Sequence, residues 1–485
     1  MGNDICYGDI FSAIKLLSSA TFLTIILGIA TNKIIAILGG TNGIAMIGLY
    51  RNLINFVVSV LSMGMTVVVV QRISTTSALE TLNEIIKTAF LFLLLQIVIV
   101  VILSFFFADV VSAWVFRSYA DSSHILEIRV VLLMAVGILI AQAMIALLNG
   151  KVNLRAITII NLVSSFSTFI LCYPLMKMGN IGLAMIIGSG SFIGACVGIF
   201  MVWRTYGLKI RNFTTSMDIF KTFSAVPVSI YLIIHPIVMT TTFLAIQVMV
   251  NNIYGVTGLG FYNAVIAIES TSLVLIMSSL RTYLLPTLGQ LSNQREKAEF
   301  VNKMITILII LMLPFIVGLI LGAKYLLLIL YSDKFIPATN LVAFQSMAML
   351  IHAFTWCYAY YLNHDARYGT YLMLDTIWSL FLLTGTWYFT SHDFPLIFVV
   401  LNYLAGCMII LILYLFVMRR LYGEGMLKTR NIKLGVTGLF LVIISYLLSE
   451  KSVVVMQVAY FFFICGYTYY LMKRYYFRER LMGVR

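Results

Sequence analysis

Charged side chains interrupt several long apolar stretches of the 485-residue sequence, and three of them could bind a ligand or an ion. Lys33 follows a Thr-Asn pair, and Arg51 stands four residues before Asn55, which places both on one helix face. Glu269 stands about ten residues inside its stretch. Two cations beside polar groups suit an anion such as a phosphate group or an acidic sugar. An isolated carboxylate suits a cation, sugar hydroxyls or a proton.

Each of these residues also has a structural explanation. Lys33 and Arg51 could extend their long side chains toward the membrane surface, and Glu269 could pack against polar partners. Asp375 lies near the end of its stretch, so anchoring at the interface is favoured over a coupling role. His235 precedes Pro236, and a proline inside a helix removes a hydrogen bond and kinks it. That pair is a candidate hinge, with a kinked packing helix as the alternative.

The composition excludes a soluble protein. The chain is 61% hydrophobic and 10% charged, with a mean hydropathy of +1.02, whereas soluble domains are about 25% charged. Its net charge of +14 is spread over short clusters between apolar stretches and not over one face or arm, so nucleic acid is not an expected partner. The sequence predicts a polytopic, all-α membrane protein.

Fourteen apolar stretches are long enough to cross a bilayer, which takes about 20 residues. They cover residues 11–38, 44–70, 88–108, 128–149, 156–176, 182–203, 224–250, 258–284, 302–322, 338–362, 371–390, 395–417, 434–449 and 452–472. Of the 32 Lys and Arg residues, 24 fall in one set of alternate loops and five in the opposite set. By the positive-inside rule both termini are predicted to be cytoplasmic, which an even number of spans allows.

An internal repeat is visible at an offset of 212 residues. Gly48-Leu49-Tyr50 and Gly260-Phe261-Tyr262 each follow a glycine-rich turn, and Arg155 and Arg367 end matching short loops. We therefore predict an N-lobe of six spans in residues 1–210 and a C-lobe of six spans in residues 211–420. Residues 421–485 then form an appended hairpin with a basic tail.

Two further patterns have structural interpretations. Gly190, Gly194 and Gly198 repeat every four residues, which predicts close approach of a neighbouring helix. Four aromatic residues, Trp356, Tyr358, Tyr360 and Tyr361, could stack on sugars, but an interfacial aromatic belt is the default interpretation.

The sequence lacks the motifs of the common enzyme classes. It contains no GxxxxGK[ST] loop, no HExxH and no GxSxG, and its six cysteines show no metal-ligand spacing. We predict that the chain is not an enzyme and needs no cofactor or metal, so any energy input would come from an ion gradient, the membrane potential or consumption of a product.

The first hairpin, GGTNGIAMIGLYRN followed by a long span and QRIS at 71–74, resembles Wzx-type O-antigen flippases of the polysaccharide-exporter branch of the MATE-related MOP superfamily. The stretch LLLILYSDKFIPATNLVAFQSMAML at 326–350 is similar to the region before the tenth span of that superfamily. Many O-antigen flippases have twelve spans and lipid II flippases have fourteen, so the cargo is less certain than the superfamily.

The resemblance implies a MATE-like fold and alternating access. The implied cargo is an undecaprenyl-pyrophosphate-linked oligosaccharide, moved across the bacterial inner membrane, with its pyrophosphate at Lys33 and Arg51. The expected partners are this substrate and membrane lipid, with a polysaccharide polymerase and chain-length proteins as further candidates. The alternatives are a lipid II flippase, an ion-coupled drug or metabolite antiporter using Glu269, and a polymerase or ligase acting on the same lipid-linked sugars.

Overall fold

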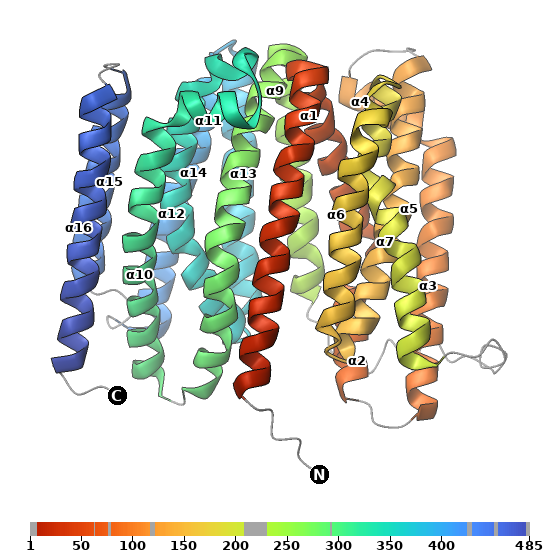
Figure 1. The fold of residues 1–485 in the computed structure, drawn as a ribbon, viewed down its shortest axis with the longest axis horizontal. Coiled ribbons are helices and arrows are strands. Elements are labelled where there is room, and N and C mark those ends of the chain that lie inside the picture. The colour runs from red at the N-terminus through yellow and green to blue at the C-terminus, as the bar shows by residue number, and fades with distance from the viewer. Residues whose placement is uncertain are drawn as a thin grey trace. The chain divides into compact units, whose positions relative to one another are not determined.

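Helices make up almost all of the regular structure in the part of the chain that the computed structural model describes, which is residues 7–62, 64–75, 79–116, 122–207, 230–291, 293–423, 429–450 and 454–481 (Figure 1). The first seven are α1 (Tyr7–Ser62), α2 (Met65–Thr75), α3 (Leu79–Phe106), α4 (Ala108–Phe116), α5 (Ser122–Gly150), α6 (Leu154–Met176) and α7 (Asn180–Tyr206). The others are α9 (Ile230–Gln290), α10 (Gln294–Leu321), α11 (Ala323–Leu330), the 3-10 helix η2 (Asp333–Ala338), α12 (Thr339–His364), α13 (Tyr368–Ser391), α14 (Ile397–Tyr422), α15 (Thr429–Glu450) and α16 (Val454–Leu481).

The predicted spans are confirmed as helices. Eleven stretches of the described residues are long and apolar enough to cross a membrane. Two of these, Ala20–Ser62 and Ile233–Met277, have 43 and 45 residues and contain a kink, so each makes two crossings. The remaining predicted span is α13, which has 24 residues but carries Asp375 and several threonines that lower its hydropathy. Together these helices account for all fourteen predicted spans.

The two kinks use the same backbone device. Gly40 interrupts α1 with φ 60° and ψ −149°, and Gly255 interrupts α9 with φ 67° and ψ −178°. A positive φ is costly for residues with a Cβ, so glycine allows the chain to reverse there without leaving helical geometry on either side. The glycine-rich turns that the sequence predicts between spans 1 and 2 and between spans 7 and 8 are therefore present.

The repeat also extends to a second pair of turns. After α5, the Val152 N–H donates to the Asn149 carbonyl (2.9 Å) and the Asn153 N–H to the Leu148 carbonyl (3.0 Å). After α12, the Ala366 N–H donates to the Asn363 carbonyl (3.3 Å) and the Arg367 N–H to the Leu362 carbonyl (2.9 Å). Val152 and Ala366 have φ values of 55° and 54°, as expected for a Schellman turn.

These hydrogen bonds correct one predicted correspondence. They align the two turns at an offset of 214 residues, so Arg367 matches Asn153 and not Arg155. The sequence-based pairing was wrong because the two loops differ slightly in length, and identical residue types at an offset of 212 hid that difference.

Val152 offers a test of strain in this turn. A β-branched residue in the left-handed region costs about 1–2 kcal/mol, and Val152 is exposed, so glycine there would lose little packing. We expect Val152→Gly to raise the free energy of unfolding by about 1 kcal/mol, measured as a higher melting temperature of the purified protein. Ala366→Gly, at the equivalent position, is expected to gain less. A lower melting temperature for Val152→Gly would contradict this.

The contacts within the described structure divide the chain into two compact units, Met1–Gly260 and Phe261–Arg485. The predicted boundary between lobes, at residues 210 and 211, lies outside the described residues. The first half of α9 has contacts within the first unit, because the Asn251 side-chain amide donates to the Val115 carbonyl (3.4 Å). The division into two six-span lobes and a hairpin stays a prediction.

The glycine stripe of α7 serves close packing, as predicted. A Cβ added at Gly190 would overlap backbone and side-chain atoms of α6, and one at Gly194 would overlap Ser164. A Cβ at Gly198 would lie 2.8 Å from the Met144 Cβ of α5. The three glycines therefore let α7 contact both neighbouring helices at short range.

In the second unit, the C-terminal helices are fixed to α10 by a buried polar cluster. The Asn431 amide of α15 donates to the carbonyl and the side-chain oxygen of Asn302 (both 2.9 Å), and the Thr306 hydroxyl donates to the Asn431 side-chain oxygen (2.7 Å). Buried polar groups that satisfy one another specify a unique packing arrangement. The last two spans are thus firmly attached to the rest of this unit.

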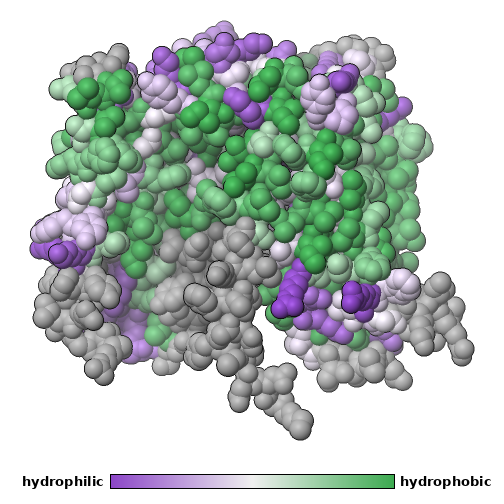
Figure 2. All heavy atoms as spheres, in the orientation of Figure 1, coloured by the Kyte–Doolittle hydropathy of each residue, from purple (hydrophilic) through white to green (hydrophobic). Residues whose placement is uncertain are grey.

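The side chains on the face drawn in Figure 2 follow the pattern of a membrane protein. Hydrophobic residues cover the middle of the helices, and hydrophilic residues gather toward the helix ends. Many large apolar side chains remain exposed along the helices, including Phe106 (73%) and Phe462 (67%). Such exposure is unfavourable in water and suits contact with lipid.

Candidate functional site

Arg51 lines a polar cavity inside the first unit. The cavity has a volume of about 200 Å³ and lies between both halves of α1 and the helices α6 and α7. Its lining residues are Thr24, Gly28, Thr31, Asn32, Ile35, Ile47, Arg51, Ser165, Thr168, Ile186 and Ile187. One cation, one amide and four hydroxyl groups thus face a common space. None of the eleven lining residues is acidic.

The helix face that carries Arg51 is the polar face predicted from the sequence. Arg51 and Asn55 are both exposed, whereas Leu53 and Ile54 between them are buried. Lys33 is half-buried and does not line the cavity, although its neighbour Asn32 does. A shared cationic surface of Lys33 and Arg51 therefore stays a prediction, while the association of Arg51 with the Thr31-Asn32 segment is present.

Glu269 is buried in the second unit, with 5% of its surface exposed, and both of its carboxylate oxygens accept hydrogen bonds. The Gln345 side-chain amide of α12 donates to Oε2, and the Tyr403 hydroxyl of α14 donates to Oε1 (3.1 Å). The sequence identified Glu269 but neither partner, because both lie on helices distant in the chain. The carboxylate is therefore held by two neutral donors.

The hydrogen-bonded chain continues from Tyr403 to His352. The Tyr403 hydroxyl lies 3.1 Å from His352 Nδ1, and the Trp356 indole N–H donates to His352 Nε2 (3.1 Å). Since an indole nitrogen only donates, Nε2 must be an acceptor, and a neutral His352 carries its proton on Nδ1. Trp378 completes an aromatic cage, with its ring centroid 5.2 Å from that of His352.

The Glu269 cluster consists of Glu269, Gln345, His352, Trp356 and Tyr403. Sequence reasoning missed three of its members, Gln345, His352 and Tyr403, although one signal was present. Residues 345, 352 and 356 recur at helical spacing along an otherwise apolar stretch, which marks a polar stripe on α12.

The aromatic belt predicted at 356–361 is wrong for two of its four residues. Tyr358 and Tyr361 are buried, with 2% and 1% exposure, so they are packed against protein and do not face an interface. Trp356 joins the Glu269 cluster through His352. The clustering of aromatic residues was correctly identified, but the choice between an exposed and a buried location depends on the neighbouring helices.

The remaining predicted residues are not brought together. Asp375 is half-buried on α13 and accepts a hydrogen bond from the Tyr414 hydroxyl of α14 (3.3 Å). His235 is half-buried and Pro236 is exposed near the described start of α9. The non-helical backbone angles within described α9 lie at Gly255 and not at Pro236. The hinge and coupling roles of these residues stay predictions.

A second buried carboxylate, Glu127, was not singled out by the sequence. It was placed in a loop of residues 109–127, but the structure places it inside α5 with 2% exposure. The Tyr50 hydroxyl donates to its Oε2 (2.6 Å), and His124 Nδ1 lies 3.1 Å from the same oxygen. These contacts join the second half of α1 to the start of α5, one residue away from Arg51.

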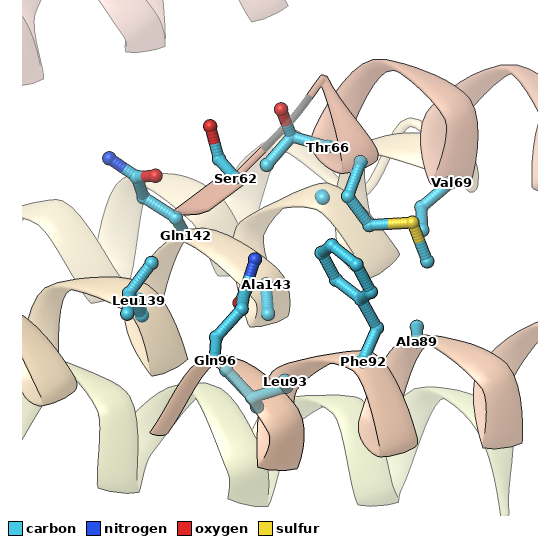
Figure 3. A pocket seen from close by; sticks show the side chains of 12 residues that line it. Ser62, Thr66, Val69, Ala89, Phe92, Leu93, Gln96, Leu139, Gln142 and Ala143 are labelled. Atoms are coloured by element: carbon cyan, nitrogen blue, oxygen red, sulfur yellow. The ribbon is translucent and has the colours of Figure 1, made fainter. Parts of the chain in front are cut away.

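A small pocket lies where α1 gives way to α2. Gly64, with φ 69°, interrupts the helix, and the freed Leu61 carbonyl accepts a hydrogen bond from the Gln96 amide (2.8 Å). Figure 3 shows the side chains of Gln96, Gln142 and Thr66 around this pocket. Its volume of about 30 Å³ holds about one water molecule, so it is too small for a substrate.

Comparison with known proteins identifies the family and the fold. Residues 43–340 match a family model described as polysaccharide biosynthesis protein, which covers more than half of the chain. No curated protein sequence matches the chain.

Three solved structures have similar folds. The lipid II flippase MurJ in an inward closed conformation is 16% identical, with 95% of this chain and 99% of that chain covered and a TM-score of 0.72. A multidrug resistance MATE family transporter of the MOP superfamily, in an inward-facing conformation, is 14% identical, with 87% and 96% covered and a TM-score of 0.66. A MOP superfamily transporter from Pyrococcus furiosus, described by the reverse polarity of its binding pocket, is 14% identical, with 86% and 96% covered and a TM-score of 0.60. At these identities the likeness establishes the fold alone.

Proposed function

The chain belongs to the polysaccharide biosynthesis protein family and has the fold of MOP superfamily transporters, and on that premise we propose that it is a flippase for a lipid-linked oligosaccharide. In this proposal the cargo is an undecaprenyl-pyrophosphate-linked repeat unit of O-antigen or a related surface polysaccharide. The protein moves its headgroup across the bacterial inner membrane by alternating access, while the polyprenyl chain stays in lipid.

The observation that carries this proposal is the lining of the Arg51 cavity. A guanidinium group pairs well with phosphate oxygens, and hydroxyl and amide groups suit the hydroxyls of a sugar. The eleven lining residues include no carboxylate, which a site for a cationic drug would need. The cavity therefore favours an anionic, hydroxyl-rich headgroup over a cationic cargo.

The topology belongs to the same proposal. Both termini are proposed to be cytoplasmic, which places the turns at Gly40 and Gly255 on the periplasmic side. In the first unit, the start of α1 lies at the opposite end of the helices from α4 (Figure 1). In the second unit, the end of α16 lies opposite α11, the short helix that follows the equivalent span. The same arrangement in both units supports this orientation.

Two alternatives share parts of this chemistry. A lipid II flippase would use the same pyrophosphate recognition, so the two flippases differ in the sugar headgroup. An ion-coupled antiporter would use Glu269 as its coupling carboxylate. A deletion strain that becomes sensitive to cationic drugs while keeping its surface polysaccharide would favour the antiporter.

A leaflet assay tests the flippase proposal directly. In a strain that lacks the protein, undecaprenyl-linked repeat units are expected to accumulate on the cytoplasmic leaflet, inaccessible to a sugar-labelling reagent added to the periplasmic side. The parental strain and a complemented strain serve as controls. Accumulation on the periplasmic leaflet would overturn the proposal and indicate a defect in polymerisation instead.

A further inference from the structure

The surroundings of Glu269 consist of hydrogen-bond donors. Gln345 presents its amide nitrogen to one oxygen, and Tyr403 presents its hydroxyl to the other. A metal cation such as Na⁺ or Ca²⁺ requires several oxygen atoms that accept, at short distance and around one point. Among the residues that the structure describes, no group of three or more His, Cys, Asp or Glu side chains could hold a metal ion.

We propose that Glu269 is the proton-binding site of the transport cycle and that a proton, not a metal ion, is the ion coupled to transport. This inference rests on the proposed function as a transporter and adds the identity of its coupling ion. The step is a simple protonation. One proton from the solution forms one O–H bond with the carboxylate, no other bond breaks, and the group changes from a charge of −1 to neutral.

The titratable groups around Glu269 support this assignment. On its own helix Tyr262 is nearby, α14 contributes Tyr403 and Cys407, and α12 contributes His352 through Tyr403. Asp375 of α13 interacts electrostatically with His352. The hydrogen-bond partners of Glu269 are uncharged. A buried carboxylate with neutral partners is stabilised most directly by taking up a proton.

Gln345 supplies a second arrangement for the protonated state. As placed, its amide nitrogen donates to Glu269, and its buried side-chain oxygen has no hydrogen-bond partner. Rotation of the amide by half a turn exchanges oxygen and nitrogen with almost no change in shape. The oxygen then accepts a hydrogen bond from the protonated Glu269. The same pair is thus complementary to both protonation states of the carboxyl group.

Infrared spectroscopy of the purified full-length protein in lipid nanodiscs tests this proposal without a transported substrate. As the pH is lowered, the C=O absorption of a protonated buried carboxyl group is expected to appear. Glu269→Gln is expected to remove this band. Glu127→Gln, which alters the buried carboxylate of the first unit, is expected to keep it. Replacing choline by Na⁺ in the buffer is expected to leave the midpoint of the titration unchanged.

Tyr403→Phe keeps the carboxylate and removes one donor. Because that donor stabilises the ionised form, the midpoint is expected to move to higher pH by about one unit. This variant keeps the test decisive if Glu269→Gln fails to fold. An unchanged midpoint in Tyr403→Phe, a band that persists in folded Glu269→Gln, or a midpoint lowered by Na⁺ would each overturn the proposal.

The two proposals fail in different ways. A titrating Glu269 band together with a normal leaflet distribution in the deletion strain would reject the flippase function and leave the proton site. Cytoplasmic accumulation of repeat units without a Glu269 band would reject the proton site and leave the flippase.

Discussion

Arg51→Ala is expected to abolish surface polysaccharide in a strain that depends on this chain. Arg51 is the cationic residue among the eleven that line the cavity of the first unit. A hydrogen bond to a charged group contributes about 1.5–3 kcal/mol, and a buried phosphate left without its cation loses more than one such bond. A loss of this size weakens headgroup binding by about tenfold to several hundredfold. Polysaccharide on gels and the leaflet position of the repeat unit measure the effect.

Two matched variants make the Arg51 result specific. Arg51→Lys keeps the charge but loses the planar pair of donors, so partial polysaccharide synthesis is expected. Arg204→Ala removes an exposed arginine at the end of α7 and is expected to retain full synthesis. Normal polysaccharide from Arg51→Ala at the wild-type membrane level would rule out its role in binding.

Gly260→Val is expected to separate two turns that touch within the first unit. A Cβ at Gly260 would overlap the backbone carbonyl of Thr41, which follows the kink at Gly40. A backbone carbonyl cannot turn aside as a flexible side chain can, and such overpacking costs about 1–3 kcal/mol. If these turns close the periplasmic side, the variant shifts the equilibrium toward conformations in which they are apart.

Thiol labelling measures that shift. A cysteine introduced by Thr41→Cys is expected to react at least about fivefold faster with a membrane-impermeant reagent in the Gly260→Val background, since 1 kcal/mol corresponds to about that factor. The chain without Thr41→Cys reports the background from its own cysteines. Gly466→Ala serves as the control substitution, because a Cβ there meets no atom within 4 Å. Equal labelling in both backgrounds would contradict this expectation.

The sequence was sufficient for the helices because it needs few long-range contacts to specify them. Apolar stretches of about 20 residues have no alternative to a helix in lipid, since every backbone polar group must be satisfied within the segment. Gly40 and Gly255 marked the reversals through the positive φ that glycine permits. The close packing of α7 could also be predicted, because glycines four residues apart leave a continuous groove.

The candidate sites could be predicted only in part, because their geometry depends on helix pairs far apart in the chain. A charge inside a span is conspicuous, so Arg51 and Glu269 were found. Gln345 and Tyr403 are ordinary residues until α12 and α14 bring them to Glu269. Glu127 was assigned to a loop because it stands near the end of an apolar stretch, and only its contact with Tyr50 shows that it is buried.

The repeated turns separate what this chain inherited from what each half acquired later. The Gly40 and Gly255 kinks and the turns at Val152 and Ala366 have been kept in both halves. At the offset of 212 residues that pairs Tyr50 with Tyr262, Arg51 corresponds to Asn263 and Glu269 corresponds to Val57. The backbone therefore imposes neither charge. A duplicated scaffold of this kind can change the sign of its cargo by a few substitutions while its architecture is conserved, so selectivity can evolve faster than fold.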